Sequence, residues 1–65
     1  MEAHQVKYGT KVKVVDDNVK IPRSSMPVKK GDIITIQRLD GMYCNAINSK
    51  GNKIYIAAWT EVEYL

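Results

Sequence analysis

The sequence predicts an all-β fold: a small five-stranded barrel with a long first loop and one short helical turn before the last strand. Three strand-like runs stand close together in the second half of the chain, at residues 32–37, 42–48 and 53–58. Asp40-Gly41 separates the first pair and Ser49-Lys50-Gly51-Asn52 the second, and Asp, Asn and Gly tolerate the positive φ of tight hairpin turns. A meander this short must curl to close its core, which favours a binding scaffold over an enzyme.

The first strand is expected at residues 10–15, where apolar and charged side chains alternate with a period of two. Its alternating valines then face the core, and its lysines face away from it. Residues 1–9 are predicted to form an extended or loose N-terminal arm, so that the barrel domain spans residues 10–65.

Residues 16–30 show no strand period and contain Pro22 and Pro27, which predicts one long ordered loop. Long loops in small barrels often carry function. At the other end of the chain, residues 57–60 are predicted to make the helical turn and residues 62–65 a short closing strand.

In the second predicted strand, Ile34 and Ile36 are expected to face the core. In the third, Cys44 and Ala46 share one face, and their small side chains suit the crowded interior at the point where a barrel strand bends. Cys44 is therefore expected to be a buried filler of the core.

Length and composition favour one small soluble domain. With 65 residues, 26% of them charged and 45% hydrophobic, the chain is unlike a disordered one. The chain contains no run of about 18 apolar residues, so no membrane span is predicted. The first residues lack the pattern of a signal peptide. A single cysteine forms no internal disulfide, so we expect a cytoplasmic protein. The net charge of +3 is a modest excess that suits an acidic partner or a nucleic acid.

Three segments, taken in order, look like parts of a known fold. They are Val28-Lys29-Lys30-Gly31-Asp32-Ile33-Ile34-Thr35-Ile36, Asp40-Gly41-Met42-Tyr43-Cys44-Asn45-Ala46 and Gly51-Asn52-Lys53-Ile54-Tyr55-Ile56. They resemble the approach to the second strand, the tryptophan-bearing strand, and the distal turn with the fourth strand of the Src-homology-3 barrel. The resemblance covers roughly residues 10–65 and implies a divergent member of bacterial or phage type.

The resemblance also implies a groove lined by aromatic residues, which in the family binds proline-rich segments. On this alignment Tyr43 takes the place of the main groove tryptophan, and Ala57 replaces the groove proline. Thr60, or Trp59 if the register slips, replaces the last groove tyrosine. The long loop is acidic in the family and basic here, so both the groove and its loop depart from those used for proline-rich ligands.

The first functional hypothesis is a non-enzymatic protein-interaction or regulatory module with an unidentified protein partner. Exposed aromatic side chains would anchor the partner, a basic residue of the loop at 19–27 would pair with a carboxylate, and the loop's prolines would limit its shapes. The candidate binding residues are Tyr43, Trp59, Arg23, Lys20, Lys29, Lys30 and Ile21. Weak self-association through an edge strand is also open.

The alternative is nucleic-acid binding, to DNA or RNA, by the basic N-terminal half. Tyr43 or Trp59 would stack on a base, and lysines and arginine would contact phosphates. These cations are Lys7, Lys11, Lys13, Lys20, Arg23, Lys29 and Lys30.

No pattern predicts catalysis, a metal or a cofactor. His4 and Cys44 stand alone, without partners at metal-ligand spacing, and no nucleophile triad or phosphate-binding loop is present. Residues 53–58 are similar to a segment of the plasmid-borne, trimethoprim-resistant dihydrofolate reductases, whose strand lines a pore. Lys53 stands where that family has its ligand-binding glutamine, which argues against that activity.

Overall fold

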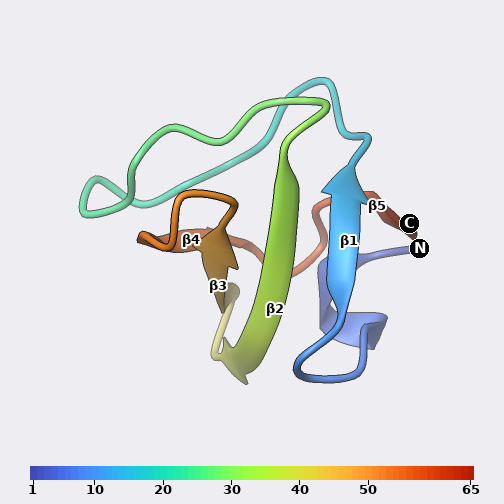
Figure 1. The fold of residues 1–65 in the computed structure, drawn as a ribbon. Helices are drawn as coiled ribbons and strands as arrows, with labels where there is room; N and C mark the ends of the chain where they lie inside the picture. Colours follow the sequence, from blue (N-terminus) through green and yellow to red (C-terminus); the bar gives the residue numbers. More distant parts are fainter.

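Five antiparallel strands form one sheet with the order β4-β3-β2-β1-β5 in the computed structural model, which describes residues 1–65 (Figure 1). The strands are β1 (Lys11–Val14), β2 (Ile33–Asp40), β3 (Tyr43–Asn48), β4 (Lys53–Ala57) and β5 (Val62–Tyr64). The all-β class and the five predicted strands are confirmed. The end strands β4 and β5 pair only with β3 and β1, so strand pairing leaves the sheet open and barrel closure remains a prediction.

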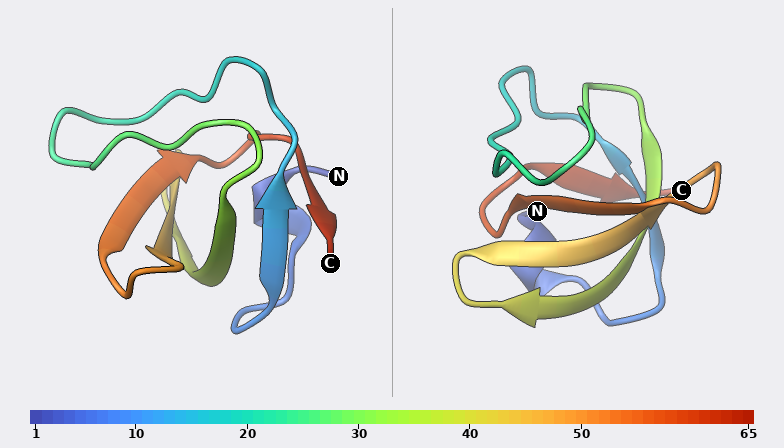
Figure 2. Two further views of the ribbon diagram at one scale, coloured as in Figure 1. Left: turned by 45° about the horizontal axis from the view of Figure 1, so that its top comes forward. Right: turned by 90° about the vertical axis from the view of Figure 1, so that its left-hand side faces the viewer.

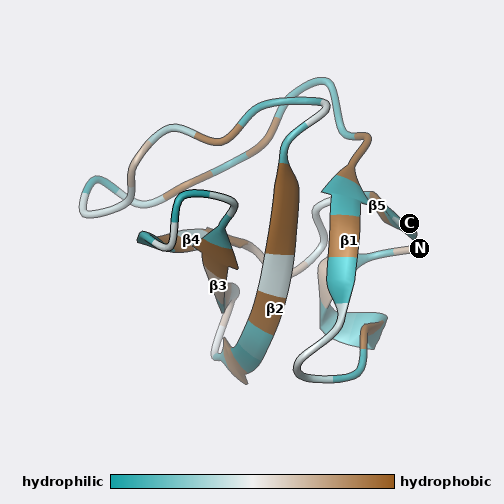
Figure 3. Cartoon of the chain, in the orientation of Figure 1, coloured by the Kyte–Doolittle hydropathy of each residue, from teal (hydrophilic) through white to brown (hydrophobic).

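The sheet curls around a core that lies on one of its faces (Figure 2). Apolar and polar residues alternate along β1, as Figure 3 shows, and its two valines are fully buried. Ile34, Ile36, Cys44 and Ala46 are also buried, which confirms their predicted place. Burial raises the pKa of the Cys44 thiol, because a thiolate loses its hydration in this apolar setting.

β2 continues to Asp40, beyond the predicted end at Gln37, because residues 38–40 also pair with β3, after a bulge. Ile36 pairs with Ala46 and Arg38 pairs with Asn45, so Gln37 is an extra residue without a partner on β3. A bulge bends its strand and changes the direction of nearby side chains. It therefore lets one long strand follow the curl of the sheet.

The long loop between β1 and β2 covers the outer edge of β4 (Figures 1 and 2). The backbone N–H of Ala57 donates to the carbonyl oxygen of Lys20 at 2.8 Å. The backbone N–H of Tyr55 donates to Oγ of Ser25 at 2.9 Å. These two donors lie on alternate residues, as expected for the N–H groups that point away from the neighbouring strand. The loop thus satisfies an edge that would otherwise be free.

The N-terminal segment is packed against the sheet, and the prediction of a loose arm is wrong. Residues Ala3–Gln5 form a short 3-10 helix, and Ala3 and Val6 belong to the buried core. The backbone N–H of Ala3 donates to the carbonyl oxygen of Thr60, and that of His4 donates to the carbonyl oxygen of Ala58. The two buried apolar side chains and these backbone hydrogen bonds together anchor the segment.

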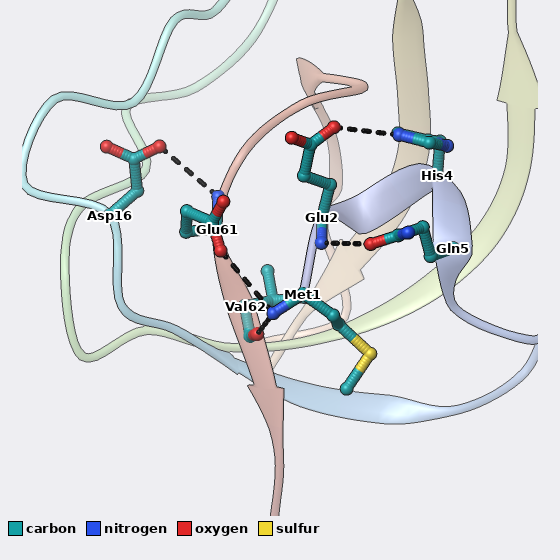
Figure 4. Close-up of polar contacts among 7 residues, drawn as sticks. All are labelled: Met1, Glu2, His4, Gln5, Asp16, Glu61 and Val62. Atoms are coloured by element: carbon teal, nitrogen blue, oxygen red, sulfur yellow. Dashed lines mark hydrogen bonds and ion pairs between the residues drawn. The ribbon is translucent and has the colours of Figure 1, made fainter.

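The same segment covers the edge of the sheet at β5. The backbone N–H of Val62 donates to the carbonyl oxygen of Met1, and the terminal amino group of Met1 donates back to the carbonyl oxygen of Val62 (Figure 4). That amino group also pairs with the carboxylate of Glu61 at 3.4 Å. Asp16 accepts a hydrogen bond from the backbone N–H of Glu61, so the start of the long loop joins this corner (Figure 4).

The predicted helical turn at residues 57–60 is a hydrogen-bonded turn and not a helix. The N–H and the hydroxyl of Thr60 both donate to the carbonyl oxygen of Ala57. The N–H groups of Ala57 and Ala58 instead bind the carbonyl oxygens of Lys20 and Met42, so no helical ladder can form. Contacts with distant parts of the chain override the local preference.

We expect Ser25→Ala to destabilise the fold, because it leaves the half-buried N–H of Tyr55 without an acceptor. The free energy of unfolding should fall by about 1–2 kcal/mol. Ser24→Ala is the matched control, since Ser24 is exposed and should change stability by less than about 0.5 kcal/mol. Urea unfolding followed by Trp59 fluorescence measures both, and equal losses for the two variants would contradict the edge role of Ser25.

We expect the Cys44 thiol to react slowly with a disulfide reagent in the native protein. The thiol is buried and its pKa is raised, so both access and the thiolate fraction are reduced. Labelling should be roughly tenfold slower or more than in the denatured chain at the same pH. Equal rates in the two states would show that the third strand opens freely.

Candidate binding face of the sheet

The candidate site lies on the outer face of the sheet, which is the side opposite the core. Because Cys44 and Ala46 on β3 are buried, the alternate residues Tyr43, Asn45 and Ile47 point to the outer face. Residues opposite each other in an antiparallel ladder share a face. The pairing register therefore assigns side chains from the four strands β1 to β4 to this surface.

Two cross-strand rows carry its charged side chains. One row runs from Lys11 through Thr35 and Ile47 to Lys53, and so crosses β1, β2, β3 and β4. The next row joins Arg38, Asn45 and Tyr55. In this way cations that are far apart in the sequence come to lie in neighbouring rows of one surface.

Three adjoining hollows lie along this face. The first has a volume of about 230 Å³, lies between β2, β3 and β4, and is lined by both Gln37 and Arg38 of the bulge. The second, of about 250 Å³, shares Ile47 with the first. The third, of about 230 Å³, shares Ile33 and Asn48 with the second and reaches the end of the long loop. We call this run of three hollows the hollow face.

The hollow face is basic. The cations that line it are Arg38, Lys53, Lys11, Lys29 and Lys50. Asp32 is the single carboxylate among the lining residues, and it accepts a hydrogen bond from the backbone N–H of Lys29 at 3.0 Å. Five cations against one carboxylate create a positive field over the three hollows.

One polar atom of a residue that lines the first hollow has no partner. Oδ1 of Asn45 is buried and accepts no hydrogen bond from any group of the protein. The residues on either side of it in the row are Arg38 and Tyr55. A buried acceptor without a donor is uncommon in folded proteins, and it lowers the stability of the fold.

The predicted site residues fall into two groups. Lys20 and Ile21 lie at the end of β4, where Tyr43 pairs with Ala57. Trp59 is in the next turn and is 46% exposed. Ile21 is half-buried against the core, so less of its side chain is free for a partner.

The remaining three predicted residues lie elsewhere. Arg23 is exposed in the turn that joins Pro22 and Ser25. Lys29 lines the third hollow, near the start of β2. Lys30 lies beside it and pairs with Asp17 at 3.1 Å, with both side chains exposed. Lys29 and Lys30 therefore stand at the opposite end of β2 from Tyr43, which pairs with Asp40.

The sequence reasoning missed Arg38, Asn45, Lys50 and Lys53 as site residues. Asn45 and Lys53 occupy outward positions of predicted strands, so the period of two was sufficient to predict that they lie on the outer face. The face of the sheet on which the Arg38 side chain lies depends on the bulge, and the sequence carried no signal for a bulge. The position of Lys50 in the turn after β3 places it beside the long loop only in the folded chain.

No helix in the structure is long and apolar enough to span a membrane. Comparisons of the chain with protein-family models, with curated proteins and with solved structures find no match.

Proposed function

We propose that the chain is a non-enzymatic binding module with a Src-homology-3-like barrel fold, and that it binds a nucleic acid across the hollow face. The strand order, the long loop between the first two strands and the short last strand support the barrel assignment. The observation that carries the function is the run of three hollows with five cations and one carboxylate. Phosphates are the partners that such a surface attracts most strongly.

The distribution of the acidic residues supports this assignment. Glu2, Asp16 and Glu61 gather at the corner formed by the two termini, where each has a partner (Figure 4). Asp17 pairs with Lys30. Of the seven side-chain carboxylates, only Asp32 lines the hollow face, which carries five cations, so the modest net charge of +3 is divided unevenly. A polyanion would meet a locally positive surface.

Half-buried apolar and aromatic side chains lie between the cations. Ile33 and Ile47 line the hollows, and Tyr55 lines the first hollow together with Arg38 and Lys53. Proteins that bind single strands combine a basic path for the backbone with aromatic side chains on which bases stack. Tyr55 provides such a side chain in the first hollow, which is lined by two cations and no carboxylate.

A second candidate function is the protein-interaction module, favoured by a separate exposed apolar corner. Met42 is 66% exposed and Trp59 is 46% exposed. The backbone N–H of Ala58 donates to the carbonyl oxygen of Met42 at 2.8 Å, which holds the two segments together. Trp, Tyr and Met are enriched at protein interfaces. Neither residue lines the hollow face, so the two candidates can be tested separately.

We expect a short, labelled, mixed-sequence oligonucleotide to bind the protein at low salt and to bind more weakly as salt rises. Lys11→Ala with Lys50→Ala should weaken binding and reduce the slope of log K against log salt by about 0.7 per lost phosphate contact. Fluorescence anisotropy over a series of salt concentrations measures both quantities.

Lys7→Ala with Lys20→Ala is the matched control, because it removes the same charge from outside the hollows. It should lose much less affinity than the hollow-face variant. Equal losses would point to general attraction by net charge, and no binding at low salt would overturn the proposal.

We expect Trp59→Ala to leave oligonucleotide affinity unchanged, since Trp59 lies outside the hollow face. Anisotropy titration of this variant beside the parent protein measures the difference. A large loss, with the fold intact by circular dichroism, would move the nucleic-acid contact to the Trp59 corner.

A further inference from the structure

We propose that the hollow face binds a single strand of nucleic acid, with about one nucleotide at each of its three hollows, and that it does so without selecting the base. The bases turn toward the sheet, and the phosphates turn toward the cations. This inference rests on the proposed function and makes it more specific, because it assigns a single-stranded ligand, its length and the side chains that contact its bases.

The hollow face has a half-buried apolar floor with exposed cations around it. Ile33, Ile47 and Tyr55 are half-buried on the strands. All five cations that line the hollows are exposed. Long basic side chains carry their charge outward into water, so the apolar surface lies nearer to the sheet than the charge does. A nucleotide is divided in the same way, into a flat base that stacks and a phosphate that carries the charge.

The charge is distributed along the run of hollows. Two cations line the first hollow, one lines the second and two line the third. Asp32 lines the third hollow as well, and its carboxylate accepts a hydrogen bond from the backbone N–H of Lys29. Each hollow therefore has at least one cation of its own. A single strand carries one phosphate for each base, so its repeat matches the repeat of the hollows.

Isoleucine side chains stand between neighbouring hollows. Ile47 lines both the first and the second hollow. Ile33 lines both the second and the third, together with Asn48 and Ser49. Apolar side chains placed between successive bases interrupt their stacking. Ile33 and Ile47 therefore contact the bases on either side of them in a strand whose bases are spread apart.

The size of the hollows limits what each of them can hold. Their volumes of about 230, 250 and 230 Å³ are below the roughly 300–1,000 Å³ usual for whole small-molecule ligands. Each hollow suits one planar base, with the sugar and the phosphate outside it. The three hollows adjoin one another, so a continuous strand can occupy all of them.

The apolar floor favours a single strand over a duplex. In a duplex the faces of the bases are covered by stacking, and only their edges are open in the grooves. Only unpaired, unstacked bases can turn their faces toward Tyr55 and the isoleucines. Such contacts do not distinguish the bases, because every base has a π-face. The hollow face is therefore selective for strandedness and tolerant of sequence.

The first test compares three labelled ligands by fluorescence anisotropy at physiological salt. They are a strand of twelve thymidines, a strand of the same length whose sugars carry no base, and a GC-rich duplex of twelve base pairs. The wild type should bind the thymidine strand about tenfold or more tighter than either of the other two. The two single strands carry equal charge, so the difference between them measures the contacts with the bases.

Ile47→Ala tests the floor without changing any charge. Its affinity for the thymidine strand should fall by about fivefold or more, while the slope of log K against log salt stays that of the wild type. Leu39→Ala is the matched control, because it removes the same number of carbon atoms from a strand residue outside the hollow face and should leave the affinity unchanged. Thermal unfolding by circular dichroism checks that both variants fold.

A series of thymidine strands from two to six nucleotides measures the length of the site on the wild type alone. Affinity from NMR titration should rise steeply up to about three nucleotides and only slightly beyond that length. The methyl signals of Ile33 and Ile47 should shift with these strands, and should not shift with the strand that lacks bases.

The outcomes distinguish this inference from the proposed function. Equal affinity for the thymidine strand and the base-free strand would overturn the contacts with bases and leave phosphate binding standing. Tighter binding of the duplex, or equal losses for Ile47→Ala and Leu39→Ala, would likewise overturn only the single-strand assignment. No binding of any ligand at low salt would overturn both proposals.

Discussion

The structure depends on how the two free edges of a short sheet are satisfied. An uncovered edge strand presents a row of unpaired N–H and C=O groups that invites pairing with other chains. Here the long loop binds the N–H groups of Tyr55 and Ala57 on β4, and the N-terminal segment exchanges backbone hydrogen bonds with Val62 on β5. Two segments without strand structure therefore complete a sheet that pairing alone leaves open. They also bring Val28, Ala3 and Val6 into a core that is close to the smallest size able to fold alone.

The same edge contacts determine where the basic residues lie. Because the loop is attached to β4 at Lys20 and Ser25, its following residues return beside the turn after β3, and Lys29 lines one hollow together with Lys50. The cations of β1, β2 and β4 reach the adjoining hollows through the pairing register. The hollow face is therefore a consequence of edge protection combined with register. Its charge does not arise from any basic run in the sequence.

Local sequence patterns were sufficient to predict the strands but not the register in which the strands pair. The period of two placed Ile34, Ile36 and Cys44 in the core, and Gly41 and Gly51 occupy turns with positive φ as expected from their spacing. The bulge at Gln37 was not predictable, because it depends on how two strands pair and produces no pattern in the sequence of either strand alone. For the same reason the neighbours of Asn45 were unknown. The family resemblance placed Tyr43 and Trp59 near one another, whereas Lys20, Lys29 and Lys30 were grouped with them because all three lie in the long loop.

The two faces of β3 differ in what they contribute to the stability of the fold. Its inner face carries Cys44 and Ala46, whose small side chains allow the sheet to curl tightly. Its outer face carries Asn45, whose unsatisfied oxygen costs about 1–3 kcal/mol of stability. Small domains have a total stability of only about 5–15 kcal/mol, so this cost is a large share of the margin. An apolar side chain of the same size would avoid the cost and keep the strand. The Asn45 amide therefore lowers the stability of the fold, and an apolar side chain at this position is expected to raise it.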